Sequence, residues 1–197
     1  MNIKKKILLV TIAYPSRESH SNGTFTKELA QCLSSKYNIT VLHCERLSKD
    51  SKNEPGIIIE KEQSVRIIHL FVKHSFIPWT LDIIIGFLKG LNHIQKEKLE
   101  IDLIHCNFFP SVIPFLFKFR KKLVILTEHW SGFPLKQLTK TNKLIAKIAI
   151  NHCKVICPVS LFLMKSMQKS GISGNFKVIP NPIDMKIMVK KIRTVKM

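Results

Sequence analysis

Acidic residues are scarce in this 197-residue sequence: 13 Asp and Glu stand against 32 Lys and Arg, which leaves a formal net charge of +19. Such an excess is larger than solubility requires, and it indicates a polyanionic neighbour: anionic lipid, nucleic acid or a phosphorylated substrate. The imbalance grows along the chain, because thirteen Lys or Arg and a single acid, Asp184, follow Glu128. Solvated helix faces explain part of this charge, and a membrane-facing patch is the other interpretation.

Long apolar runs and a disulfide pattern are also missing. No apolar run reaches the roughly 18 residues of a membrane-spanning helix. The start of the chain imitates a signal peptide, but no small-residue cleavage site follows, and the apolar run has the length of a strand. The five cysteines are scattered and contain no C-x-x-C pair. They are therefore expected to be buried, reduced thiols of a cytoplasmic protein, and no metal site is expected.

Several sequence motifs that would define other functions are absent. No G-x-G-x-x-G follows the first apolar run, which argues against a dinucleotide-dependent oxidoreductase. There is no zinc-finger spacing, helix-turn-helix signature or aromatic-rich RNA motif, and the aromatic residues are not interleaved with the lysines. The net charge is then the only argument for nucleic acid, so no nucleic-acid partner is expected.

Short apolar runs alternate with segments of helical periodicity along nearly the whole chain. The expected strands are residues 6–12, 39–43, 65–71, 101–105, 123–126, 153–158 and 176–179. Helices are expected after Gly23, after Pro78, over residues 136–151 with Leu144, Ile148 and Ala149 inward, and from a cap at Ser160 to Gly171. An apolar helix or helical hairpin is expected from Phe108. Residues 45–63 are expected to form a mobile loop that contains at most a short strand at 57–60. Nearly continuous apolar strands that alternate with helices predict an α/β fold: a Rossmann-like parallel sheet, helices on both faces, and the first strand at its centre.

Polar side chains gather where the fifth of these strands ends. The apolar run of residues 123–126 stops at Thr127, Glu128, His129 and Trp130. Ligands bind at the carboxyl ends of strands in open α/β sheets, so this stretch is the first candidate for a site. A single histidine after a strand is more often a loop residue bonded to nearby backbone, and only the rest of the chain favours the functional interpretation.

Two further segments leave alternatives open. Asn22 could cap the helix that follows Gly23, whose first-turn N–H groups could then hold an anion, or Gly23 could serve only the turn. The tail after Asp184 places apolar side chains on one helical face with lysines around them. This pattern suits a basic amphipathic helix on anionic membrane, or the tail is a remnant of a connection, which is the preferred interpretation.

Six segments, in this order, resemble the amino-terminal half of a family 4 retaining glycosyltransferase, which is built from two facing Rossmann-like domains. They are K-K-I-L-L-V (5–10), N-G-T-F-T-K-E-L-A (22–30), I-D-L-I-H-C (101–106), T-E-H-W-S-G-F (127–133), V-I-C-P-V-S (155–160) and K-V-I-P-N-P-I-D (177–184). The resemblance implies that a domain of residues 1–180 holds the acceptor, while a second domain grips a nucleotide-sugar donor. That donor is a substrate, so no cofactor is expected.

The resemblance also assigns roles to single residues. His129 matches the histidine that hydrogen-bonds the donor sugar near the reacting carbon, and Glu128 beside it orients it or binds acceptor hydroxyls. Gly23 matches the loop that approaches the donor phosphates. The remaining assignments are Asn22 and Thr24 in the same phosphate loop, His105 and Trp130 on the acceptor side, and Asn181 and Asp184 as hinge residues, with residues 181–197 forming a hinge remnant and basic tail.

Some features depart from the family pattern. In the family, two glutamates eight positions apart hold the donor in the second domain. This sequence has no such pair in a Gly-rich context. The first loop also has one glycine where a close pair is common. The expected function is therefore the acceptor-side half of a glycosyltransferase for cell-surface polysaccharide, truncated or one part of a split enzyme and inactive alone. Its expected partners are a nucleotide-sugar, a saccharide or lipid-linked acceptor, a donor-binding domain on another chain, and an anionic surface at the inner membrane face. The alternative is a nonenzymatic Rossmann-like module that docks on a partner protein or membrane.

Overall fold

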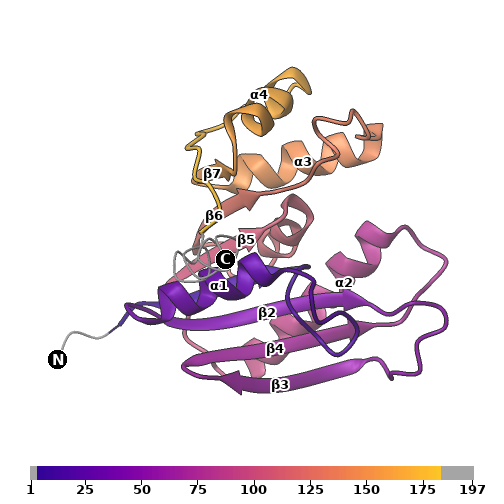
Figure 1. The fold of residues 1–197 in the computed structure, drawn as a ribbon, viewed down its shortest axis with the longest axis vertical. Helices are drawn as coiled ribbons and strands as arrows, with labels where there is room; N and C mark the ends of the chain where they lie inside the picture. Colours follow the sequence, from indigo (N-terminus) through magenta and orange to yellow (C-terminus); the bar gives the residue numbers. More distant parts are fainter. Residues whose placement is uncertain (1–3, 183–197) are drawn as a thin grey trace, which may run out of the picture.

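The computed structural model describes residues 4–182, in which seven strands form one sheet in the order β3-β4-β2-β1-β5-β6-β7. The elements are β1 (Lys6–Thr11), α1 (Thr24–Ser34), β2 (Asn38–Arg46), β3 (Gly56–Glu62), β4 (Val65–Val72), α2 (Trp79–Lys96), β5 (Leu103–Asn107), the 3-10 helix η1 (Phe109–Leu116), β6 (Leu123–Glu128), α3 (Lys140–His152), β7 (Val155–Pro158) and α4 (Leu161–Lys169). All neighbouring strands are parallel except β3 and β4. The predicted Rossmann-like fold and the central place of β1 are confirmed (Figure 1).

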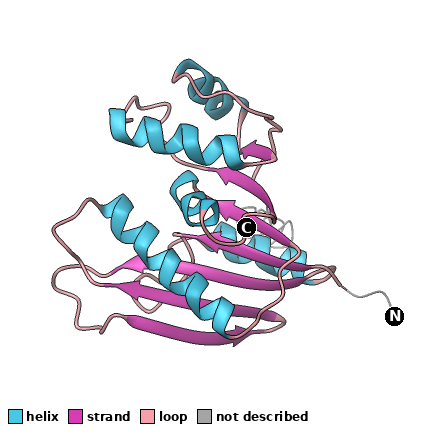
Figure 2. Ribbon diagram, turned by 180° about the vertical axis from the view of Figure 1, so that it is seen from behind, coloured by secondary structure: helices cyan, strands magenta, loops and turns pink. Residues whose placement is uncertain are grey.

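Helices cover the two faces of this sheet unequally. Successive side chains of β1 point to opposite faces, so Leu8 joins one buried cluster and Leu9 the other. The larger cluster packs α2, η1, α3 and α4 on one face, and Figure 2 shows α2 and α3 in front of the sheet from that side. On the opposite face α1 covers the region of β1, β2 and β4 through Leu29, Ala30 and Leu33.

The short strand expected at 57–60, within the mobile loop predicted over residues 45–63, is confirmed but longer than predicted. Gly56–Glu62 form β3, which pairs antiparallel with β4 through a turn in which Gln63 has φ 53°. Ile57 and Ile59 of this edge strand are 42% and 46% exposed, because the strand is covered poorly on both faces. Its mixture of apolar and charged residues therefore gave no sign of a buried strand.

Some predicted features of the last helices are confirmed and others are wrong. Ser160 caps α4, since its Oγ accepts a hydrogen bond from the Leu163 amide at 3.1 Å, and Gly171 follows the helix with φ +76°. α3 begins at Lys140 rather than at residue 136, because the Oγ1 of Thr139 caps it. Residues 176–179 form only one bridge, between Phe176 and Ile156, instead of a strand.

The apolar residues of α3 also face differently from the prediction. Leu144 and Ile148, expected to point inward, are 59% and 43% exposed, whereas Ala146, Ala149 and Ile150 are buried. The small side chains of Ala146 and Ala149 thus let α3 approach η1 closely. Among the cysteines, which are all free, Cys32 is exposed, although it was expected to be buried.

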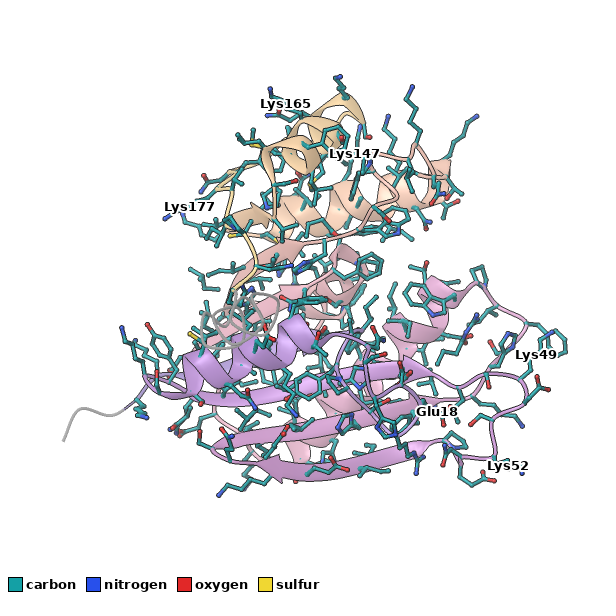
Figure 3. The ribbon with its side chains drawn as sticks, in the orientation of Figure 1. Glu18, Lys49, Lys52, Lys147, Lys165 and Lys177 are labelled. Atoms are coloured by element: carbon teal, nitrogen blue, oxygen red, sulfur yellow. The ribbon has the colours of Figure 1, made fainter. Side chains whose placement is uncertain are left out.

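A further question is whether any helix of this chain could span a membrane. No helix within residues 4–182 is long and apolar enough to cross a bilayer. Figure 3 shows Lys147, Lys165 and Lys177 at the α3 and α4 end of the molecule, and Lys49 and Lys52 at the other end. Attachment to an anionic surface stays a prediction.

A pair of buried histidines makes stability depend on pH. His43 in β2 and His69 in β4 share a hydrogen bond between their Nδ1 atoms, 2.9 Å apart, so one ring donates and the other accepts. Burial and the neighbouring His69 lower the pKa of His43 from 6.5 to about 3. Burial also lowers the pKa of His69, against the charge of Glu60. In the unfolded chain both rings take up a proton near pH 6.5, so acid favours unfolding.

We therefore expect the free energy of unfolding to fall as the pH is lowered from 6.5 toward 4. Each buried histidine adds up to about 1.4 kcal/mol per pH unit to this slope. The His43→Asn variant should show a shallower slope in urea unfolding measured at several pH values. His20→Asn, at an exposed position, is the control and should keep the wild-type slope. Equal slopes for wild type and His43→Asn would contradict the assignment.

Candidate functional site

A cavity of about 360 Å³ lies at the carboxyl ends of β1, β5 and β6, and it is called the strand-end cavity here. Its lining comes from the segments that follow these strands and from the first residues of α1 and α2. Its polar members are Thr80, Asn107, Glu128, His129, Ser131 and Asn142. The sequence predicted a ligand-binding edge where the run of residues 123–126 ends, and the cavity lies at that edge.

Glu128 is fully buried beneath this cavity and holds the backbone around it. One carboxylate oxygen accepts hydrogen bonds from the amides of His129 at 3.0 Å and Trp130 at 2.9 Å, and the other accepts one from the amide of Phe109 at 3.1 Å. Burial raises the pKa of Glu128 to about 7, although the hydrogen bonds from the three backbone amides act to lower it. Because both oxygens are occupied, Glu128 orients the loop rather than reaching a substrate.

His129 lies at the border between the strand-end cavity and a second opening beside α1. Its ring packs on Phe25 of α1, with centroids 4.5 Å apart. Burial lowers the pKa of His129 to about 4, so the imidazole is neutral at pH 7. Its Nε2 has no hydrogen-bond partner within residues 4–182. A neutral imidazole in this place can donate or accept one hydrogen bond to a bound ligand.

Trp130 belongs to an aromatic cluster on the wall of the strand-end cavity. Its ring centroid lies 5.5 Å from that of Phe133, 5.8 Å from that of Phe109 and 6.2 Å from that of Phe108. A Cβ atom on Gly132 would meet the Trp130 ring at 2.2 Å, so glycine is required beside it. These contacts fix the indole in one position, which makes it a rigid part of the wall.

The expected phosphate loop lies at the start of α1. Gly23 itself is the N-cap, in the left-handed conformation with φ 70° and ψ 29°, and no side chain caps the helix, so Asn22 is not the cap that the sequence suggested. A Cβ atom on Gly23 would lie 2.1 Å from the carbonyl of Ala13, so glycine allows this close approach. Asn22 and Thr24 are exposed beside it. The geometry explains the turn, and the contact with donor phosphates stays a prediction.

The remaining expected residues lie elsewhere. His105 does not line the strand-end cavity: it faces an apolar groove of about 800 Å³ between α1 and the strands β5, β6 and β7, where its Nε2 lies 2.7 Å from Thr127 Oγ1. Burial lowers the pKa of His105 to about 4. Asn181 lies at the edge of the same groove, and Asp184 is outside the described residues. Within residues 4–182, no three His, Cys, Asp or Glu side chains are grouped to hold a metal ion.

The comparison with protein families decides the assignment. The model of Glycosyltransferase Family 4 matches residues 23–186, which are most of the chain. The chain belongs to glycosyltransferase family 4. No curated protein matches this family 4 chain.

Solved structures show the same fold. Sucrose-phosphate synthase from Thermosynechococcus elongatus has a TM-score of 0.68 at 14% identity, over 98% of this family 4 chain and 53% of the synthase. A shorter chain of that synthase has a TM-score of 0.63 at 15% identity, over 97% of both chains. The Anabaena protein HepE, in complex with UDP and glucose, has a TM-score of 0.56 at 12% identity, over 97% of this chain and 50% of HepE. The family 4 chain thus spans about half the length of the full synthase and of HepE.

Residues from α2 and β5 were missed by the sequence analysis of this family 4 chain. Trp79 and Thr80, in the first turn of α2, and Asn107, the last residue of β5, line the strand-end cavity beside His129. Asn107 is buried, and its amide donates to Thr26 at 3.4 Å. Two signals could have found them: Pro78 marks the start of a helix, and Asn107 ends a strand, as Glu128 does.

Proposed function

We propose that this chain is the acceptor-side half of a glycosyltransferase that acts in cell-surface polysaccharide synthesis. The family match supports glycosyl transfer, and the observation that carries the assignment of this half is the strand-end cavity, where His129 presents a neutral imidazole. The sugar would come from a nucleotide-sugar and pass to a hydroxyl of a saccharide or lipid-linked acceptor. UDP and glucose bound to HepE support a nucleotide-sugar as the donor class.

In the proposed reaction the bond between the sugar and the nucleotide diphosphate breaks, and a bond from the same sugar carbon to the acceptor oxygen forms. The nucleotide diphosphate leaves and takes up the proton that the acceptor hydroxyl loses. His129 hydrogen-bonds the sugar next to the reacting carbon and stabilises the charge that develops there. Glu128 keeps the amides of His129 and Trp130 in place and does not contact the substrate. Both act on positioning and electrostatics rather than as nucleophiles.

The donor-binding half is proposed to be supplied by a further segment or a second chain. This proposal is supported by the share of the full synthase that the chain spans, 53%. Translation of the gene region after the codon of Met197, in all three frames, should show a Gly-rich segment with two glutamates eight positions apart. Its absence would favour the nonenzymatic binding module instead.

The direct test is His129→Ala in the assembly of this chain with the donor-binding half. Loss of one preorganised hydrogen bond to developing charge should lower kcat on the order of 100-fold. The affinity for the nucleotide, measured by titration with the free nucleoside diphosphate, should change little, because the donor-binding half holds it. The exposed His20→Ala is the matched control. Full transfer activity in His129→Ala would overturn the role of His129, and transfer by the purified chain alone would overturn the claim that it is an inactive half.

A further inference from the structure

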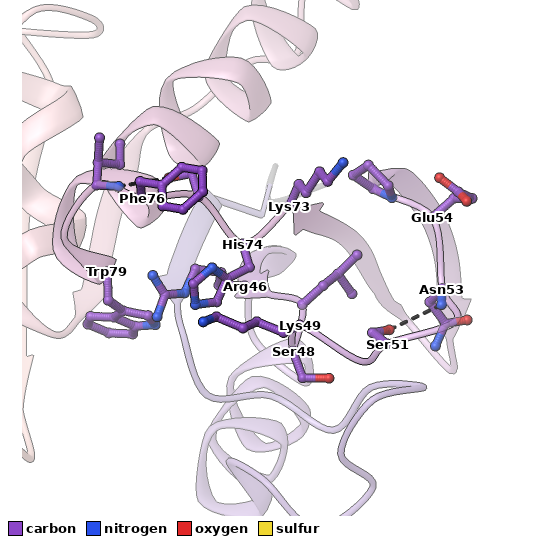
Figure 4. Close-up of a pocket in the computed structure, with 14 residues that line it drawn as sticks. Arg46, Ser48, Lys49, Ser51, Asn53, Glu54, Lys73, His74, Phe76 and Trp79 are labelled. Atoms are coloured by element: carbon purple, nitrogen blue, oxygen red, sulfur yellow. Dashed lines mark hydrogen bonds between the residues drawn. The ribbon is translucent and has the colours of Figure 1, made fainter.

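A second, larger cavity of about 980 Å³ lies beyond the carboxyl ends of β2 and β4, and it is called the basic cavity here (Figure 4). It is lined by the segment that follows β2 and by the connection from β4 to α2. Trp79 lines both the basic cavity and the strand-end cavity. The two cavities therefore share this residue in their walls.

The lining of the basic cavity is predominantly positive. It contains the three cationic side chains of Arg46, Lys49 and Lys73 against the single carboxylate of Glu54. Figure 4 shows Arg46 and Lys49 directed toward the Trp79 end of the cavity, whereas Lys73 is directed toward the far end, where Glu54 lies. Two of the three cationic side chains thus point toward the Trp79 end, and all three line a cavity that would attract an anionic group.

Arg46 is held in place by an ion pair with Asp82 of α2. One of its guanidinium nitrogens donates to Asp82 at 3.1 Å, and the other oxygen of Asp82 accepts from Ser75 at 2.6 Å. Desolvation acts to raise the pKa of Asp82, but the hydrogen bonds of Ser75 and Arg46 and the charge of Arg46 prevail and lower it, so the carboxylate stays ionised. A guanidinium has five N–H donors, so donors remain for a ligand. Because Asp82 offsets the charge of Arg46, the net attraction depends on Lys49 and Lys73.

Large apolar side chains lie exposed at the mouth of the same cavity. Phe76, which is completely exposed, and Ile77 both line the basic cavity. Leu81 and Ile85 of α2 continue from Ile77 at four-residue spacing and are 42% and 43% exposed. These four residues are called the apolar stripe. Exposed apolar residues beside cationic ones suit an amphiphile that carries a phosphate.

We propose that the acceptor is a lipid-linked phosphate. Its phosphate occupies the basic cavity between Arg46, Lys49 and Lys73, its apolar chain lies on the apolar stripe, and its sugar end passes Trp79 toward His129. This inference rests on the proposed function and narrows its acceptor class. Guanidinium and ammonium groups together recognise phosphate well, one by paired hydrogen bonds and the other as point charges.

The test measures binding of dodecyl phosphate to the chain by calorimetry, below the micelle concentration and without a nucleotide-sugar. The Lys49→Gln/Lys73→Gln variant should bind at least tenfold more weakly than wild type. Lys147→Gln/Lys165→Gln removes the same charge from α3 and α4, at the opposite end of the molecule (Figure 3), and should bind as wild type does. Equal weakening in both variants would mean unspecific electrostatics and would overturn the site.

The apolar half of the proposal is tested separately. Phe76→Ser/Leu81→Ser should weaken the binding of dodecyl phosphate at least fivefold, whereas Leu144→Ser/Ile148→Ser, which removes two exposed apolar side chains from α3, should not.

Glucose 6-phosphate tests whether the site takes a soluble phosphate instead. If glucose 6-phosphate binds as tightly as dodecyl phosphate, the lipid-linked assignment is wrong. Dodecanol should bind at least tenfold more weakly than dodecyl phosphate, and equal binding would remove the role of the phosphate. Because no sugar is transferred, these results are independent of the His129→Ala experiment.

Discussion

Gly23→Ala is expected to lower the free energy of unfolding by about 4 kcal/mol, near the upper end of single substitutions. Two costs add. A φ of +70° disfavours any residue with a Cβ atom by about 1 kcal/mol. The new Cβ would also lie 2.1 Å from the Ala13 carbonyl and 2.5 Å from the Tyr14 amide, and neither backbone group can rotate away. The start of α1 or the segment after β1 has to move, which costs about 3 kcal/mol more.

The chain offers a matched control for this prediction. Gly171 has φ +76°, but its Cβ atom would meet only the flexible end of Lys143, at 3.5 Å. Gly171→Ala should therefore lose about 1 kcal/mol, which is the conformational cost alone. Urea unfolding of both variants separates the two costs. Similar losses in the two variants would show that the contact between Gly23 and Ala13 relaxes easily.

Glu128→Ala is expected to lose about 4 kcal/mol, because it leaves the buried amides of Phe109, His129 and Trp130 without an acceptor at about 1 kcal/mol or more each. Glu128→Gln should lose about half as much. Its carbonyl oxygen can still accept from His129 and Trp130, while its NH₂ group faces the Phe109 amide, a second donor. Glu100→Gln, at an exposed position, is the control and should leave the stability close to that of wild type.

The pH dependence of Glu128→Gln gives an independent measurement. Burial raises the pKa of Glu128 in the folded chain from 4.5 to about 7. A raised carboxyl pKa favours the folded state below pH 4.5, and this contribution is lost as the pH rises toward 7. Glutamine does not titrate, so the difference in unfolding free energy between the variant and wild type should shrink across this window. A constant difference would show that Glu128 keeps an ordinary pKa.

The sequence predicted best the strands that are buried on both faces of the sheet, and the helix ends that are defined by local hydrogen bonds. Residues 7–10 of β1 are all apolar because Leu8 and Leu9 face different helical layers, so its central place could be predicted. Ser160 and Gly171 marked the ends of α4 through local hydrogen bonding and backbone conformation, which need no tertiary information. The edge strand β3 was predicted only as a short segment at 57–60, because its pairing with β4 is tertiary and its residues stay largely exposed.

The candidate site was predictable only in part, for a similar reason. Glu128, His129 and Trp130 follow a buried strand and were found from that position. Trp79 comes from a helix that is distant in the sequence, and only the packing of α2 on the sheet brings it to His129. His105 was placed with Trp130, but strand alternation turns it to the opposite face of the sheet. The direction of a side chain at a strand end depends on register, which the sequence alone did not fix.

The three hydrogen bonds that Glu128 accepts from backbone amides support the cavity wall separately from the side chains on it. The carboxylate connects the segment after β6 to the segment after β5, and its partners in both segments are backbone N–H groups. The path of the main chain at positions 129 and 130 is therefore set independently of which side chains stand there. Substitutions at these two positions would therefore change the side chains on the cavity wall while the hydrogen bonds accepted by Glu128 stay in place.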